Sequence, residues 1–195
     1  MNDCIFSSFC SELTCDKSCP CLSESSYLLE RNKITFDSSV FNMGEAVSEN
    51  IEEFLNKTED QILVAIKVDK TSIKAEQITY GCILRYFEGS QLHCVVYSLK
   101  FQRYLDLIQK SWGMKSEPTE LEYMRIFMDS CKILIISGLD FIMFKDFQCQ
   151  TLLTLLQDRE ADNRQTILVL PKTDLLGEGP FFAILKDQLD KVVKK

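Results

Sequence analysis

The chain has 195 residues, enough for about one globular domain with a small appendage, and its 46% hydrophobic and 26% charged residues are ordinary for a soluble protein. No apolar run approaches the roughly 20 residues that span a bilayer, and residues 1–9 lack the basic start of a signal peptide, so we expect a cytoplasmic protein with no membrane contact. The formal net charge is −7, and residues 1–60 hold 12 Asp and Glu against 4 Lys and Arg, whereas residues 61–195 hold 17 against 18. Because phosphate binding needs clustered basic residues, the acidic front excludes a broad nucleic-acid surface there and suits solvent or a protein partner.

Cysteines gather at the front of the chain. Of nine in all, five lie within the first 21 residues, and four soft ligands this close in sequence can hold a zinc ion: Cys10, Cys15, Cys19 and Cys21. Their spacings are irregular, so free thiols are the alternative, whereas a disulfide is not expected in a reducing compartment. We therefore divide the chain into residues 1–44, a Cys-rich, acidic segment with a candidate zinc knuckle, and residues 45–195, the main domain.

Helical periodicity and short apolar runs alternate through the main domain. In chain order they predict a helix over 45–57, a strand over 61–68, a helix over 75–87, a strand over 92–97, helices over 99–112 and 119–129, a strand over 132–137, a helix over 147–158, a strand over 166–170 and a last helix from Pro180. Strands that are unbroken apolar runs, separated by helices, are typical of a parallel sheet covered on both faces. The predicted fold is therefore α/β, a three-layer α/β/α core with a mainly parallel sheet. Ligands bind such sheets at the carboxyl ends of the strands, which directs the search for chemistry to those ends.

The segment after the first strand holds part of a phosphate-binding motif. A P-loop needs two glycines, so that backbone N–H groups can face phosphate, followed by Lys and then Ser or Thr. Lys70 and Thr71 supply the last two residues directly before a helix, but Val64 and Asp69 occupy the glycine positions. A β-branched residue resists positive φ, and an Asp places negative charge where phosphate would lie. We interpret Lys70 and Thr71 as the relic of a phosphate site.

The ends of the third and fourth strands lack the polar residues of a nucleotide hydrolase. Ser137 and Gly138 stand where a magnesium-holding carboxylate is needed. Asp140 comes two residues later, so we expect it to point elsewhere, as a loop or helix-cap residue. Pro171 follows the fourth strand in place of a polar sensor residue. With His93 as the one histidine of the chain, no serine or cysteine hydrolase triad can be assembled either.

An apolar segment, Phe141 to Phe144, follows the third strand. Because it lies beyond a strand end, we expect it to be more exposed than the other phenylalanines. Phe141 and Phe144 are therefore candidates for a partner contact.

The order of these elements resembles the bacterial replicative-helicase loaders, the DnaC/DnaI/IstB-type AAA+ ATPases. Cys19-Pro-Cys-Leu22 is similar to the end of the zinc-binding segment that precedes the ATPase core in many members, and residues 32–41 are similar to the stretch that leads into the core. Residues 132–139 align with the Walker B strand, and residues 164–170 align with the strand that follows it. The resemblance covers roughly residues 10–175, rests on order and spacing, and implies a P-loop, AAA+-like core.

Several residues that these ATPases need for hydrolysis are missing from this chain, so ATP hydrolysis is not carried over from the resemblance. Both P-loop glycines, the Walker B acids and the sensor Asn are absent, and no arginine follows Arg164 to act as an arginine finger. We therefore expect a pseudo-ATPase with no catalytic residues and no bound ATP. The resemblance implies an accessory or regulator of DNA replication that binds a replicative helicase or its loader.

Two alternatives stay open. A RecA-like pseudo-ATPase subunit of recombination or repair would hold single-stranded DNA in a basic, aromatic groove, for which Lys100, Arg103 and Lys110 are the candidates. An ATPase with a non-standard nucleotide site would use Lys70, Thr71 and Asp140.

Overall fold

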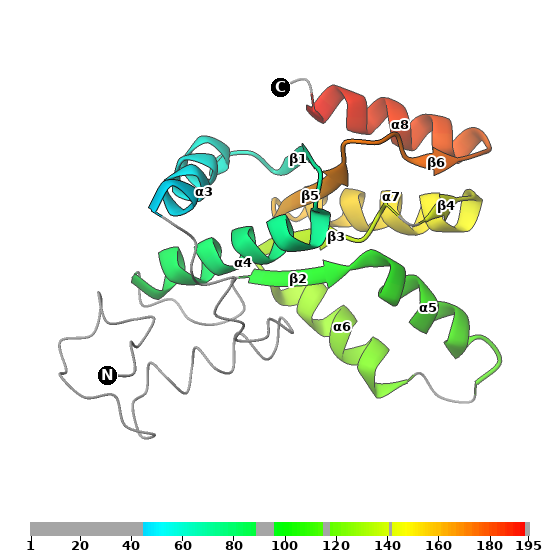
Figure 1. The fold of residues 1–195 in the computed structure, drawn as a ribbon. Coiled ribbons are helices and arrows are strands. Elements are labelled where there is room, and N and C mark those ends of the chain that lie inside the picture. Colours follow the sequence, from blue (N-terminus) through cyan, green and yellow to red (C-terminus); the bar gives the residue numbers. More distant parts are fainter. Residues whose placement is uncertain (1–44, 89–95, 115–117, 141, 194–195) are drawn as a thin grey trace.

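A computed structural model describes residues 45–88, 96–114, 118–140 and 142–193 of the chain (Figure 1). Its elements are α3 (Glu45–Thr58), β1 (Leu63–Val68), α4 (Thr71–Glu88), β2 (Val96–Lys100), α5 (Phe101–Ser111), α6 (Thr119–Ser130), β3 (Ile133–Ser137), β4 (Met143–Phe144), α7 (Asp146–Ala161), β5 (Gln165–Pro171), β6 (Leu176–Gly177) and α8 (Pro180–Val193). This alternation of strands and helices confirms the predicted α/β class. Within these ranges, every helix falls short of the length and apolar character that a membrane span requires.

The central sheet has four strands, all parallel, in the order β1-β5-β3-β2. Its register pairs Ala65 with Leu168 and Leu99 with Ile136. Every residue of β3 is buried, which explains why its sequence is an unbroken apolar run and not an alternating one. Because β5 lies between β1 and β3, the carboxyl ends of β1 and β3 are one strand apart at the same edge of the sheet.

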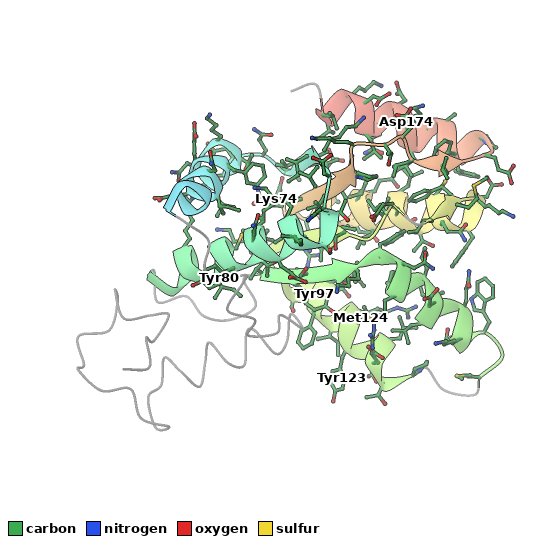
Figure 2. The ribbon with its side chains drawn as sticks, viewed as in Figure 1. Lys74, Tyr80, Tyr97, Tyr123, Met124 and Asp174 are labelled. Carbon is green, nitrogen blue, oxygen red and sulfur yellow. The ribbon has the colours of Figure 1, made fainter. Side chains whose placement is uncertain are left out.

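Successive strand side chains enter two separate cores. On one face, α3 and α4 pack over Ile133 and Ile135 of β3, and on the other α5, α6, α7 and α8 pack over Leu134 and Ile136. Figure 2 shows the side chains that fill the space between these layers, with Tyr97 of β2 among those in the α5–α8 core. The molecule therefore has three layers, α/β/α, as the apolar runs predict.

A second, two-stranded sheet joins the segments that follow β3 and β5. β4 and β6 run parallel, with Phe144 opposite Gly177. Gly177 leaves room for an aromatic ring, because a Cβ there would lie 2.3 Å from Cδ2 of Phe182. Phe144 stacks on the same ring, with centroids 6.2 Å apart, so β4 and β6 hold the start of α8 at the carboxyl edge. Sequence patterns do not predict these strands, since two residues carry no periodicity.

The predicted boundaries fail at two places. Helix α4 begins at Thr71 and not at residue 75. Strand β2 covers Val96–Lys100 and not 92–97, and α5 begins at the very next residue, Phe101. No Gly or Pro marks this junction, so the apolar pattern alone could not place it. Residues 89–95, part of the predicted strand, lie outside the described ranges.

A buried arginine at the amino edge of the sheet was not predicted. Arg159 of α7 is 2% exposed. Its guanidinium donates hydrogen bonds to Thr166 Oγ1 at 2.9 Å and to the carbonyl oxygens of Met128 at 2.7 Å, Cys131 at 3.2 Å, Lys132 at 3.2 Å and Gln165 at 2.7 Å. Burial lowers the pKa of this guanidinium, and the surrounding acceptors compensate for its lost hydration. Arg159 thereby joins α7 to the end of α6 and to the starts of β3 and β5.

Candidate functional site

The carboxyl edge of the sheet is where the sequence places any chemistry. In a parallel sheet all strands end at the same edge, and here the segments after β1, β3 and β5 meet there. The polar residues of these segments are Asp69 and Lys70 after β1, Asp140 after β3, and Lys172 and Asp174 after β5.

The connection between β1 and α4 is too short to form a phosphate loop. β1 continues to Val68 and α4 begins at Thr71, so only Asp69 and Lys70 lie between them. Val64, which stands at the first glycine position of the motif, lies inside the strand, buried and paired with Ile167. A P-loop needs its residues between the two glycine positions free to curl around phosphate. In this chain those residues are extended in β1.

Asp140 reaches the first turn of α4. The Thr71 hydroxyl lies 3.3 Å from each carboxylate oxygen of Asp140 and donates to that carboxylate. Thr71 is 5% exposed and Asp140 is half-buried. The expectation that Asp140 points away from this segment is therefore wrong. A helix dipole favours negative charge near the helix N-terminus, and the Asp140 carboxylate contacts Thr71, the first residue of α4.

Gly138 directs the chain from β3 toward this contact. Its φ is +73°, in the left-handed region that favours glycine. It also passes close to the β2–α5 junction, because a Cβ on Gly138 would lie 3.8 Å from the backbone nitrogen of Phe101. Gly138 thus sets the direction of the chain at the position where a nucleotide hydrolase would need a metal-binding acid.

The remaining charges of these segments and of the first turn of α4 are two exposed ammonium groups, two exposed carboxylates and a half-buried lysine. Lys172 Nζ lies 2.7 Å from Asp69 Oδ2, and the Lys172 backbone N–H donates to the Val68 carbonyl at 3.1 Å. Lys70 is exposed and makes no ion pair or hydrogen bond through its side chain within the described residues. Lys74, one turn into α4 (Figure 2), has its pKa lowered by burial. Thr71 and Asp140 are the oxygen-bearing side chains of this edge that lie within hydrogen-bond distance of each other.

The apolar surface of this edge differs from the predicted one. Phe144 is fully buried, so it belongs to the core and is not available to a partner, while Phe141 lies outside the described residues. The β4–β6 pairing instead exposes Met143 and Leu176, which lie opposite each other and are 50% and 65% exposed. Alternation along β4 explains why Met143 is exposed and Phe144 is buried, because successive strand residues point to opposite sides. Trp112, at the end of α5, is a further exposed apolar side chain, at 62%.

The basic residues considered for DNA binding do not form a free row. Arg103 is held by Glu120, with its Nη2 2.6 Å and its Nε 2.9 Å from Glu120 Oε1. Lys100 and Lys110 are exposed. Of the three candidate residues, only Lys100 and Lys110 therefore remain to contact a single-stranded nucleic acid.

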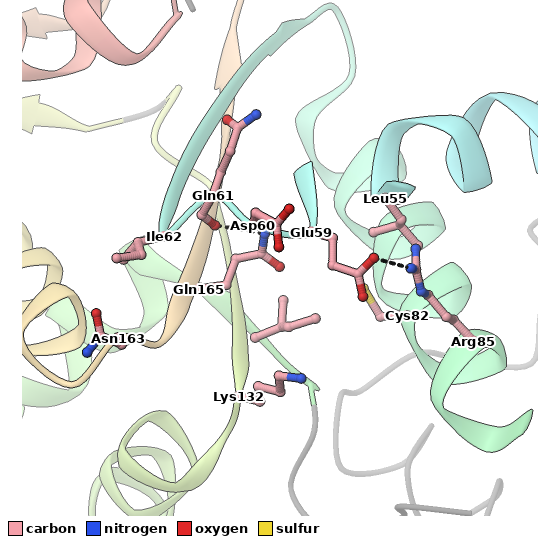
Figure 3. Close-up of a pocket in the computed structure, with 11 residues that line it drawn as sticks. Leu55, Glu59, Asp60, Gln61, Ile62, Cys82, Arg85, Lys132, Asn163 and Gln165 are labelled. Carbon is pink, nitrogen blue, oxygen red and sulfur yellow. Dashed lines mark hydrogen bonds and ion pairs between the residues drawn. The ribbon is translucent and has the colours of Figure 1, made fainter. Parts of the chain in front are cut away.

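A described cavity lies at the opposite, amino edge of the sheet (Figure 3). It measures about 140 Å³ and is bounded by the end of α3, the middle of α4 and the starts of β3 and β5. Its polar groups are engaged with each other: Arg85 Nη2 lies 2.7 Å from Glu59 Oε2, and Gln165 Nε2 donates to the Gln61 carbonyl at 2.9 Å. This cavity is remote from Thr71 and Asp140, and its polar groups serve to connect elements.

The proposed zinc ligands Cys10, Cys15, Cys19 and Cys21 lie outside the described residues, as does His93. Among the described residues no group of three or more His, Cys, Asp or Glu side chains could hold a metal ion. The described cysteines Cys82, Cys131 and Cys149 are buried and not disulfide-bonded, and burial raises the pKa of Cys82 to about 12. They behave as small core side chains.

The carboxyl edge therefore combines a contracted β1–α4 connection, a Thr71–Asp140 contact and exposed apolar side chains on β4 and β6. Comparison with protein-family models, with curated proteins and with solved structures finds no match to this chain.

Proposed function

We propose that this chain is a P-loop-type, AAA+-like domain that acts by binding another protein and not by hydrolysing nucleotide. The observation that carries the proposal is the two-residue connection between β1 and α4. Without a loop at this point, the backbone cannot present the row of N–H groups that holds a nucleotide's phosphates. From the resemblance to helicase loaders, we propose a replicative helicase or its loader as the partner.

The sheet order supports the P-loop part of the proposal. The first strand lies beside the last, and the second strand lies at the far edge. This differs from the Rossmann order 3-2-1-4-5-6 and the flavodoxin order 2-1-3-4-5. It allows the residue after the β1 connection, Thr71, to meet Asp140 after β3 across a single intervening strand.

Electrostatics support binding over catalysis. Asp69 precedes the first residue of α4 by two positions and Asp140 contacts that residue, so a phosphate at the start of α4 would meet like charge. The exposed Met143 and Leu176 at the same edge offer apolar area of the kind that protein interfaces bury. The well-packed core and the short β1–α4 connection together favour a protein-binding role over an enzymatic one.

Two measurements test the proposal. Calorimetry with ATP and ADP in the presence of magnesium should detect no binding.

Purified replicative helicase and its loader should be tested separately as partners, and one of them should be captured by the wild-type chain. Met143→Asp with Leu176→Asp should weaken that capture at least tenfold, whereas Ile126→Asp, an equally exposed site on α6, should not. Capture that is unaffected by the double substitution would remove the β4–β6 surface from the proposal, and failure to bind either protein would contradict the proposed partners.

The Thr71–Asp140 contact also favours a second candidate, an ATPase with a non-standard site. A hydroxyl and a carboxylate are oxygen ligands suited to magnesium, and the exposed Lys70 stands beside them. This candidate requires magnesium-dependent ATP turnover that falls when Lys70→Ala, Thr71→Val or Asp140→Asn is introduced. Absence of turnover in the wild-type chain would exclude it.

A further inference from the structure

Strand β1 is the outer strand of the described sheet on the side of α8. Among residues 45–88, 96–114, 118–140 and 142–193 it pairs with β5 alone. The ladder is framed by hydrogen bonds from the Thr166 N–H to the Ile62 carbonyl at 2.7 Å and from the Lys172 N–H to the Val68 carbonyl at 3.1 Å. In a parallel ladder alternate residues bond to a given neighbour, so the even-numbered residues of β1 face β5. The residues between them turn both their N–H and their C=O groups away from the sheet: Leu63, Ala65 and Lys67.

Helix α8 packs against β1, but no described residue is hydrogen-bonded to this row of outward backbone groups. None of the three residues forms a backbone hydrogen bond outside the β1–β5 pairing. β3 is buried throughout, but in β1 only Val64 is buried, with Lys67 exposed and the other side chains half-buried. Proteins protect edge strands with prolines, bulges, charges or covering elements. Within the described residues, β1 has the charge of Lys67 and the packing of α8, and it has no proline. An edge of this kind is a template for another strand.

We infer that this edge pairs with the same edge of a second copy of the chain. The two β1 strands would run antiparallel about a two-fold axis through Ala65, so that the sheets of both copies become continuous. In this register Ala65 faces Ala65 of the other copy, and Leu63 faces Lys67 in both directions. Each outward N–H and C=O of the three residues then has a partner, since directly opposed residues in such pairs exchange both hydrogen bonds.

The side chains of β1 favour a second copy over an unrelated strand because they complement themselves in this register. The smallest residue, Ala65, lies at the axis, where two identical side chains must meet. On the α8 face, each Lys67 lies opposite an aliphatic Leu63 and not opposite another lysine, and like charges directly opposite would be unfavourable. On the α4 face, Val64 lies opposite Ile66, a pair of β-branched residues of the kind that stabilises sheets. Such an interface is isologous, with the same patch contributed by both copies.

The test is the mass of the full-length chain in solution, measured by light scattering over a wide concentration range. We expect twice the monomer mass of 22.5 kDa for the wild-type chain. Ala65→Pro should reduce the mass to that of the monomer. It removes an N–H that points outward and leaves the β1–β5 ladder intact, and proline is tolerated at such edge positions. Unchanged circular dichroism would show that the variant is folded.

Cross-linking tests the register without relying on proline. Ala65→Cys would place two thiols on residues with Cα atoms about 5.5 Å apart, within disulfide range. Lys67→Cys is the matched control, because the two copies of residue 67 would be offset by about 13 Å along the strands. Oxidised samples, digested and compared with wild type for background from native cysteines, should contain the 65–65 peptide pair and no 67–67 pair. A monomeric wild type, a folded Ala65→Pro that remains dimeric, or a dimer without the 65–65 pair would each overturn the inference.

Discussion

At the scale of single residues, the contact between Thr71 and Asp140 is the most informative feature of the chain. The two residues are 69 positions apart, and their meeting depends on β5 lying between β1 and β3. Local sequence could identify Lys70-Thr71 as a motif fragment and Asp140 as a helix-cap candidate. It could not join them, because strand order is a property of the assembled sheet.

Removal of the Asp140 carboxylate should destabilise the fold modestly. Asp140→Ala leaves the buried Thr71 hydroxyl without its acceptor and removes a charge from the start of α4, which together should cost about 1–2 kcal/mol. Asp174→Ala, at an exposed position on the same edge, should change stability by less than about 0.5 kcal/mol. Urea denaturation of both variants measures the difference. An Asp140→Ala protein more stable than wild type would indicate that the carboxylate is kept for binding a ligand, at the expense of stability.

Arg159 illustrates a structural residue that sequence analysis overlooks. A lone arginine near the end of a predicted helix carries no periodic signal, and its acceptors are mostly backbone carbonyls, which leave no trace in a sequence. Arg159→Leu should destabilise the chain by at least about 3 kcal/mol, since several buried acceptors lose their donor at once. Arg159→Lys should rescue little of this, because an ammonium lacks the planar fork of a guanidinium.

The matched control is Arg125→Leu, at an exposed position on α6. It should change stability by no more than about 1 kcal/mol, the range of exposed ion pairs. Thermal unfolding followed by circular dichroism separates the two cases. Equal effects of the two substitutions would contradict the structural role assigned to Arg159.

At the scale of elements, the close approach of α3 and α4 depends on Gly81. A Cβ on Gly81 would lie 2.5 Å from Cγ2 of Ile51, too close for either helix to remain in place. Gly81→Ala gains about 1 kcal/mol of helix propensity but incurs the 1–3 kcal/mol of overpacking, so we expect a small net loss of stability. In an Ile51→Ala background the clash disappears, and the same substitution should become stabilising. A double-mutant cycle measured by urea unfolding tests this reversal of sign, and additive effects would contradict the contact.

Elements were predictable where burial on both faces imposes a strong pattern, as in β3 and β5. The positions of these strands follow from their apolar runs within a few residues, and so does that of β1, although only Val64 of β1 is buried. Prediction failed at β2, where Lys100 leads directly into α5 with no turn residue between, and at β4 and β6, which are too short for a pattern. The predicted partner surface was wrong because β4 was not predicted: alternation within this strand buries Phe144 and exposes Met143.

At the scale of the whole molecule, residues 45–193 contain both cores that stabilise the sheet. The members of these cores come from α3 through α8, from the four central strands and from β4, and we expect the main domain to fold without a metal ion. Its described residues also lack a cluster of metal-binding side chains. Any zinc bound to the full-length chain is therefore expected to be held by the cysteines of residues 1–44.

The last prediction follows from this separation of core and cysteines. We expect the full-length chain, purified with zinc, to contain about one zinc ion, held by Cys10, Cys15, Cys19 and Cys21. Cys15→Ser with Cys19→Ser should remove the metal, whereas Cys82→Ser, at a buried site in the core, should not. A chelator should release zinc from the full-length chain without changing the melting temperature of a 45–195 fragment, because no ligand set lies in that core. Elemental analysis of both proteins decides the case: zinc that remains with the fragment would place the metal in the main domain and contradict the division at residue 45.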